Sequence, residues 1–204
     1  MGGDNGPLVV IEGALEAARR YRDTLQVVLV GDEPEIRRHL PASLAAELQV
    51  EVVHTSETIG MAESATTVYR KRQDASVVVA TRLMAERKVD AMVSAGNTGA
   101  VVTASLLGLG RLKGVVRPAI ASLVPTPKSH TVLLDVGANS DIKPIHLLQF
   151  AVMGRVYAQY VFEVPNPKVG LLNIGEESSK GSEVAQQAFR MLDDSREKIG
   201  RAHV

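Results

Sequence analysis

The chain has 204 residues, of which 45% are hydrophobic but only 3% aromatic, and its 23 basic and 23 acidic residues give a formal net charge of zero. The balanced charge and the scarcity of aromatic rings argue against nucleic-acid binding, which needs a basic surface or base-stacking rings. The absence of Cys excludes disulfides and thiolate chemistry and fits a reducing cytoplasm. No stretch approaches the roughly 20 apolar residues of a membrane-spanning helix.

Short aliphatic runs alternate with helical patterns along the chain. Strands are predicted at 27–31, 50–54, 90–94, 119–124, 131–136 and 169–174. Helices are predicted at 8–21, 76–88, 98–112, 144–160 and 178–192. We expect Ser76 to be an N-cap and the apolar 98–112 helix to be buried. The linker 126–129 is too short for a crossover helix, which allows a hairpin. The alternation predicts an α/β fold with a largely parallel sheet.

Both ends of the chain depart from this pattern. The segment 2–7 reads as a strand-to-helix loop, so we expect a strand to precede it. Residues 199–204 match one reading frame of a common sequencing adapter, and we therefore expect a non-native tail there. The predicted organisation is one α/β domain over 1–198, truncated at both ends, followed by the tail 199–204.

Four loops at predicted strand ends are rich in Gly and Asn, namely 2–7, 94–99, 135–141 and 173–181. Ligands of parallel sheets bind at the carboxyl ends of strands. Gly allows close approach of the backbone, and the first N–H groups of a helix attract anions. Lys180 adds a positive charge to the last loop. The set predicts phosphate binding, although any one such loop is more often only a turn and a cap.

Other kinds of site have weaker support. The sequence contains no Walker A loop, no dinucleotide-binding Gly motif and no Gly-x-Ser-x-Gly elbow. The five His residues are scattered and never fall at helical ligand spacing, so no metal site is expected. Asp135 and Asp141 are interpreted as turn-stabilising residues, and Glu176 and Glu177 as partners of a helix dipole. We therefore expect neither a metal nor a cofactor.

Taken together, the motifs resemble the PlsX family, the phosphate acyltransferases of bacterial phospholipid synthesis. The longer matches are SAGNTGA at 94–100, LLDVGAN at 133–139 and LLNIGEE at 171–177, the last followed by Lys180 and Gly181. Shorter matches lie at 1–4, 29–32, 117–119 and 149–154. The matches run in family order from residue 1 to about residue 192.

The resemblance implies a three-layer α/β/α fold similar to those of isocitrate and isopropylmalate dehydrogenases. It implies an acyltransferase that moves a fatty acyl group from acyl-acyl carrier protein to inorganic phosphate, giving acyl phosphate for phospholipid synthesis. The implied protein is a cytoplasmic homodimer, peripheral at the inner face of the membrane when full-length. It needs no cofactor and no nucleic acid.

The resemblance and the chemistry of the loops assign roles to named residues. Lys180 and Asn97 are the predicted catalytic residues, with Lys180 stabilising phosphate or the oxyanion. The predicted substrate-binding residues are Gly3, Asp4, Ser94, Gly96, Thr98, Gly99, Gly137, Asn139, Asn173, Gly175 and Glu176. The family continues well past residue 192, so we expect this fragment to be inactive alone.

Two other functions stay open. The first is a different enzyme on a related scaffold, such as a phosphotransacetylase or an isopropylmalate-type dehydrogenase. An assay that compares a carrier-protein thioester with acetyl-CoA separates the transferases. The second is a non-catalytic phosphate-binding module, which would bind phosphate without consuming a thioester.

Overall fold

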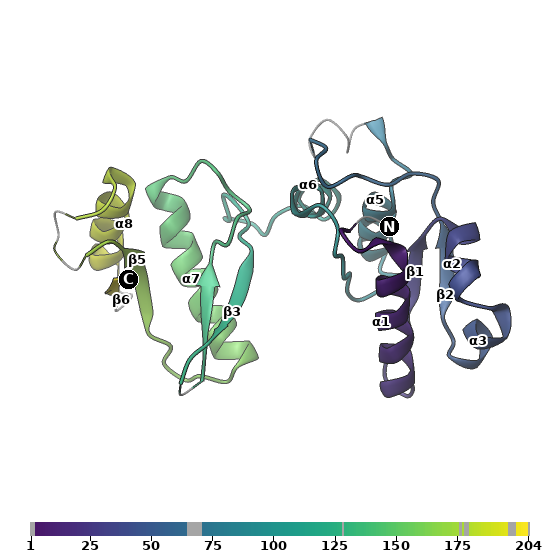
Figure 1. The fold of residues 1–204 in the computed structure, drawn as a ribbon. Helices are drawn as coiled ribbons and strands as arrows, with labels where there is room; N and C mark the ends of the chain where they lie inside the picture. Colours follow the sequence, from purple (N-terminus) through teal and green to yellow (C-terminus); the bar gives the residue numbers. More distant parts are fainter. Residues whose placement is uncertain are drawn as a thin grey trace. The chain divides into compact units, whose positions relative to one another are not determined.

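The computed structural model describes residues 3–64, 71–127, 129–175, 177 and 180–195, together with the backbone of 199–203. It divides into two compact units, Met1–Gly110 and Arg111–Val204 (Figure 1). The predictions of one domain over 1–198 and of a non-native tail stay predictions.

The first unit is built around a parallel strand pair. Its elements are α1 (Gly6–Arg20), β1 (Val28–Gly31), α2 (Glu33–His39), α3 (Ala42–Glu47), β2 (Glu51–His54), α5 (Ser76–Ala85) and α6 (Thr98–Gly108). β1 pairs with β2 in parallel, with Val28 opposite Glu51 and Gly31 opposite His54. The short helices α2 and α3, which the sequence patterns did not predict, form the crossover between the two strands.

The core of this unit follows from the spacing of aliphatic residues. Ile11, Leu15 and Ala18 recur at helical intervals along α1, so they share one face and are buried. They form one cluster with Leu29 of β1 and Ile36 of α2. A smaller cluster contains Ile59, Ala75, Val78 and Ala100. Helix packing on β1 thus fixes the loops at the strand ends.

Three expectations for this unit are wrong. Residues 90–94 lie outside any strand, and they form a ladder with no described strand. Ala75, not Ser76, is the N-cap of α5, and the Ser76 N–H donates to the carbonyl of Glu57. α6 is buried only at Ala100 and Ala104, because α5 is its main packing partner within this unit.

The second unit contains an antiparallel hairpin and a further parallel pair. Its elements are β3 (Ala121–Pro125), β4 (His130–Leu134), α7 (Pro144–Val161), β5 (Val169–Asn173), α8 (Glu183–Asp194) and β6 (Ile199–His203). β3 and β4 pair antiparallel, which confirms the hairpin, and β5 pairs with β6 in parallel. α7 packs against β4, β5 and α8 (Figure 1).

Local sequence explains where the helices of this unit begin. Pro144 occupies the first turn of α7, as predicted, where its missing N–H removes no helical hydrogen bond. α8 begins at Glu183, because the Ser182 side chain caps it by accepting from the Ala185 N–H at 3.2 Å. The predicted start of this helix at 178 falls outside the described residues.

Candidate functional site

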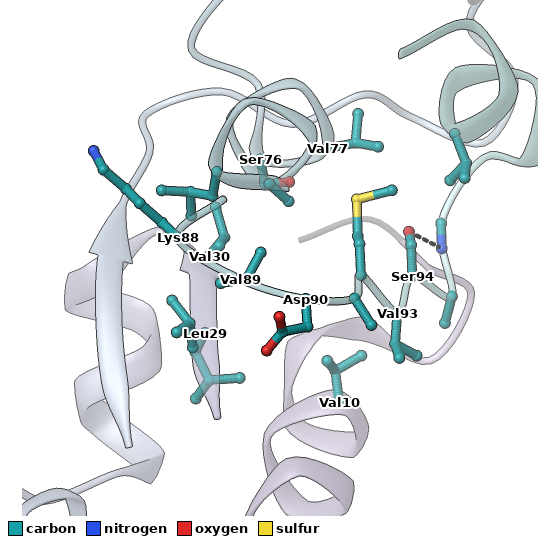
Figure 2. Close-up of a pocket in the computed structure, with 18 of the residues that line it drawn as sticks. Val10, Leu29, Val30, Ser76, Val77, Lys88, Val89, Asp90, Val93 and Ser94 are labelled. Atoms are coloured by element: carbon teal, nitrogen blue, oxygen red, sulfur yellow. Dashed lines mark hydrogen bonds between the residues drawn. The ribbon is translucent and has the colours of Figure 1, made fainter. Parts of the chain in front are cut away.

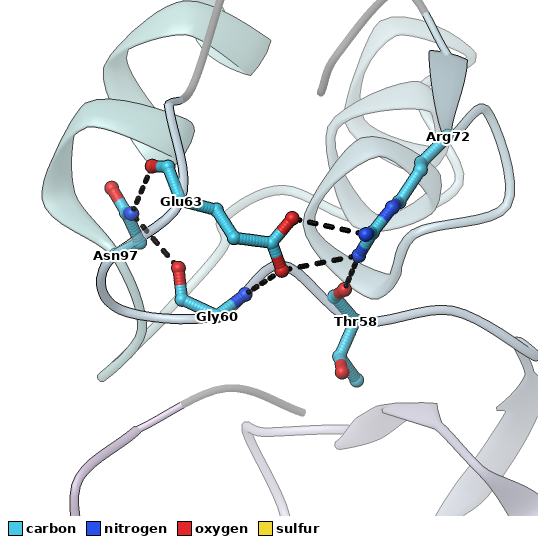
Figure 3. Close-up of polar contacts among 5 residues, drawn as sticks. All are labelled: Thr58, Gly60, Glu63, Arg72 and Asn97. Atoms are coloured by element: carbon cyan, nitrogen blue, oxygen red, sulfur yellow. Dashed lines mark hydrogen bonds and ion pairs between the residues drawn. The ribbon is translucent and has the colours of Figure 1, made fainter. Parts of the chain in front are cut away.

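The loop 94–99 of the first unit is held by one amide side chain. Asn97 is the N-cap of α6, and its Oδ1 accepts from the Ala100 N–H at 3.0 Å. Its Nδ2 donates to the carbonyls of Gly60 and Glu63 at 3.0 and 3.1 Å (Figure 3). It also donates to the Met61 carbonyl at 3.0 Å. The whole side-chain amide is therefore engaged by backbone, and Asn97 fixes the loop to the segment 60–63.

The segment 60–63 is itself held by an ion pair that the sequence patterns did not predict. The Arg72 guanidinium contacts both carboxylate oxygens of Glu63, at 3.2 and 3.0 Å, and donates to the Thr58 carbonyl at 2.7 Å (Figure 3). One of these oxygens, Oε1 of Glu63, also accepts from the Gly60 N–H at 2.9 Å. Two oppositely charged residues nine positions apart gave no recognisable signal in the sequence.

The first and second Gly/Asn loops meet in this unit. A Cβ added to Gly3 would lie 3.2 Å from the Ala95 carbonyl oxygen, and the φ angle of Gly3 is +150°, so this position favours Gly. Thr98 and Gly99 begin α6 and are exposed, while the caps engage the later N–H groups of Ala100 and Val101. The start of α6 thus offers two open peptide N–H groups beside the Gly3 loop.

Further predicted residues lie around this junction. Asp4 is exposed in the first loop. The Ser94 hydroxyl oxygen accepts from the Gly96 N–H at 3.2 Å, which closes the turn that leads into α6. The structure thus brings together the predicted residues of the first unit.

In the second unit, Asp135 organises the loop that follows β4. One carboxylate oxygen accepts from the N–H groups of Ile120 and Ala138, at 2.8 and 3.2 Å. The other accepts from the backbone and side-chain N–H groups of Asn139, at 2.9 and 3.0 Å. The predicted turn-stabilising role of Asp135 is confirmed. Gly137, at φ +119°, forms the bend of the loop around this carboxylate.

Asn139 joins this loop to the start of the hairpin. Its Nδ2 also donates to the Pro118 carbonyl at 2.9 Å, and its Oδ1 accepts from the Arg117 guanidinium at 3.4 Å. The side chain of Asn139, like that of Asn97, is therefore engaged in hydrogen bonds within the protein.

Positive charge gathers where α7 begins. His146 is buried, and its Nδ1 accepts from the Lys143 N–H at 3.1 Å. Burial, reinforced by the charges of Arg117 and Lys143 and opposed by Asp141, lowers the pKa of His146 below its ordinary value. The imidazole is therefore neutral near pH 7, with its proton on Nε2.

The loop after β5 carries Lys180. Asn173 donates from Nδ2 to the carbonyls of Gly175 and Lys180, at 3.0 and 3.2 Å. The Lys180 N–H donates to the Glu177 carbonyl at 3.0 Å. Lys180 is exposed and forms no ion pair with any residue that the structure describes, so its charge is available to an anion. Glu176, a predicted binding residue, lies outside the described residues.

The three loops share one construction. In each, an Asn side chain hydrogen-bonds to main-chain groups and so holds the shape of the loop. Over the described part of the chain, no group of three His, Asp or Glu side chains is placed to hold a metal ion. Nor does any described helix combine the length and apolar character needed to cross a membrane.

The described helices and strands define an α/β fold. The phosphotransacetylase EutD of Staphylococcus aureus matches with a TM-score of 0.52 over 94% of this chain and 72% of its own, at 15% identity. A family model described as "Fatty acid synthesis protein" matches residues 1–202, and the chain belongs to that family. The predicted α/β fold and the family resemblance are both confirmed.

Several relatives carry the same name. A phosphate acyltransferase of Heliobacterium modesticaldum is 51% identical over 196 residues, which are 96% of this chain and 58% of the relative. One from Pelotomaculum thermopropionicum is 50% identical over 192 residues, or 94% of this chain and 55% of the relative. The chain thus spans little more than half the length of these relatives.

Proposed function

We propose that the chain is part of a phosphate acyltransferase that moves a fatty acyl group from acyl-acyl carrier protein to inorganic phosphate. The observation that carries the proposal is Lys180, an exposed cation without an ion-pair partner among the described residues, held in a braced loop at the end of β5. Family membership and the relatives named phosphate acyltransferase support the reaction type.

The proposed chemistry needs no protein nucleophile. A phosphate oxygen attacks the thioester carbonyl, a new C–O bond forms, and the C–S bond then breaks. The acyl phosphate leaves, and the carrier-protein thiolate takes a proton from water. The protein holds a dianion against the carbonyl and stabilises the oxyanion, which Lys180 does through its charge.

Asn97, Asn139 and Asn173 take part as positioning residues in this proposal. Their amides fix the shapes of the three loops, and phosphate is received by open peptide N–H groups such as those of Thr98 and Gly99. The proposed phosphate and acyl contacts are Gly3, Asp4, Ser94, Gly96, Thr98, Gly99, Gly137, Gly175 and Glu176. A homodimer, a cytoplasmic location and peripheral attachment to the inner face of the membrane belong to the proposal through the family resemblance.

The test replaces Lys180 with Ala, and the equivalent lysine in the intact Heliobacterium relative. Turnover of acyl-acyl carrier protein, measured by trapping acyl phosphate with hydroxylamine, should fall in the relative about 100-fold or more. Phosphate binding to the 204-residue chain, followed by ³¹P NMR, should weaken in parallel. Lys168→Ala, which removes an exposed lysine outside the loops, is the matched control and should change neither.

Three results would contradict the proposal. Near-normal turnover by the Lys180 variant would refute its role. A preference of the intact relative for acetyl-CoA over the carrier-protein thioester would favour a phosphotransacetylase. Phosphate binding without thioester consumption would favour a non-catalytic module.

A further inference from the structure

The start of α7 carries positive charge that has no counter-ion. Arg117 and Lys143 form no ion pair with any residue that the structure describes. The cavity of about 350 Å³ in the first unit differs, because mainly aliphatic side chains line it (Figure 2). The charged residues of its described lining are Lys88 and Asp90, and Lys88 is paired with Glu86 at 2.8 Å. Charge that can attract an anion therefore lies in the second unit.

Arg117 is held beside α7 by two amide side chains. Gln149 of α7 accepts from the Val116 N–H at 2.8 Å, which fixes the main chain before Arg117. Asn139 donates to the Pro118 carbonyl at 2.9 Å, which fixes the main chain after it. The Asn139 Oδ1 also accepts from the guanidinium at 3.4 Å, and Arg117 is half-buried. An arginine held in this way loses less conformational entropy when it binds an anion.

The ring of His146, in the first turn of α7, adds a hydrogen-bond donor. The residue is only 3% exposed, and its Nδ1 accepts from the Lys143 N–H at 3.1 Å, so the proton of the neutral ring is on Nε2. Nε2 has no acceptor among the described residues. Among the enclosed side-chain N and O atoms of the described chain, only Oγ1 of Thr55 lacks a partner, so Nε2 reaches solvent. The buried ring thus offers its free N–H to a ligand at the surface.

The charges that face this ring are mainly positive. The charged groups that act on His146 are Arg117, Lys143 and the exposed Asp141, which together leave an excess of one positive charge. The first turn of α7 contains no acidic residue, so the helix dipole adds to the positive potential. The N–H of Ile145, second in the helix, has no partner within it.

These donors match the geometry of phosphate. A carboxylate presents two oxygens in one plane, whereas phosphate presents its oxygens in several directions. Guanidinium binds phosphate through paired N–H groups, and an ammonium binds it as a point charge. We propose that Arg117, Lys143 and His146 form a phosphate-binding subsite at the start of α7. The subsite itself does not depend on the proposed function, but its occupant does, and is either inorganic phosphate or the phosphodiester of the pantetheine arm of the carrier protein.

The experiment titrates inorganic phosphate into the 204-residue chain with Lys180→Ala, so that the loop lysine contributes nothing. The ¹⁵N shift of His146 Nε2 and the amide shift of Ile145 should move and saturate with phosphate. Acetate is the control anion and should bind at least about tenfold more weakly. No saturating shift, or equal affinity for acetate, would overturn the proposal.

Two matched pairs of variants locate the subsite. Arg117→Gln and Lys143→Gln should each weaken phosphate binding at least about tenfold, because each removes a charged donor. Arg190→Gln and Lys168→Gln make the same changes at exposed residues of the same unit, and should leave affinity within about twofold. Unchanged amide shifts in α8 show that the unit stays folded. Equal effects within the pairs would overturn the proposal.

A second probe distinguishes the two phosphate sources. Affinity for pantetheine 4′-phosphate at least about tenfold above that for inorganic phosphate assigns the subsite to the arm of the carrier protein. Equal or weaker affinity assigns it to inorganic phosphate. Both measurements report binding without turnover and without Lys180. Failure of the Lys180 test therefore leaves this subsite standing, and loss of the subsite leaves the Lys180 test intact.

Discussion

Replacing Gly181 by Ala should release the loop that carries Lys180. The φ angle of Gly181 is +89°, which an L-residue adopts at a cost of about 1 to 2 kcal/mol. The new Cβ would also lie 2.9 Å from Cγ and 3.0 Å from Nδ2 of Asn173, so that side chain must move. Its two hydrogen bonds to the carbonyls of Gly175 and Lys180 are then lost, at about 1 kcal/mol each.

The total destabilisation of the second unit should therefore be about 3 to 4 kcal/mol. The control is Gly114→Ala, because Gly114 has a φ angle of +91° and open space where its Cβ would stand. This control should show only the backbone strain, about 1 to 2 kcal/mol. Urea unfolding, followed by amide exchange within 144–194, measures both changes in the same unit.

A double-mutant cycle isolates the contribution of Asn173. In an Asn173→Ala background the clash is absent, so Gly181→Ala should cost no more than Gly114→Ala. The coupling between positions 173 and 181 should be about 2 kcal/mol. If Gly181→Ala destabilises the unit equally in both backgrounds, Asn173 does not brace the loop and this reasoning is refuted.

Three further outcomes are expected. The lowered pKa of His146 means that the folded chain binds fewer protons than the unfolded chain, so the second unit should lose stability as pH falls below about 6.5. Urea midpoints measured at successive pH values should show this loss. The His146→Gln variant should show a smaller loss. Asp135→Ala should lower the free energy of unfolding by about 3 kcal/mol in the same assay, because the carboxylate accepts from three backbone N–H groups and one side-chain amide. A decrease below about 1 kcal/mol would contradict that role. Glu63→Gln should destabilise the first unit by only about 1 kcal/mol, since the pair with Arg72 is partly exposed, and adding about 1 M salt should shrink the difference.

Elements whose signal is local could be predicted from the sequence. The aliphatic run at 27–31 became β1, Pro144 marked the start of α7, and the short linker 126–129 indicated the hairpin. The segment 90–94 has the same aliphatic signal, yet a strand also needs a neighbour, and no local pattern reports whether one is present.

The arrangement of the candidate site was harder to predict from the sequence. The loops themselves were recognisable from Gly and Asn after strands, and Lys180 from its place in the last loop. The role of the Asn side chains could not be recognised from the sequence, because Asn97 binds carbonyls that lie 34 to 37 residues earlier in the chain. Contacts at that separation depend on packing, which neither periodicity nor composition encodes.

The braced loops of Asn97, Asn139 and Asn173 restrict how this protein can evolve. A contact made by a side chain changes with one substitution, whereas every residue except Pro supplies the same peptide N–H. Under the proposed function, substitutions on the outer surface of such a loop therefore alter little of what it recognises. Inherited changes in ligand preference would have to begin behind the loop, at the three amides and at Gly positions such as Gly181 that set its shape.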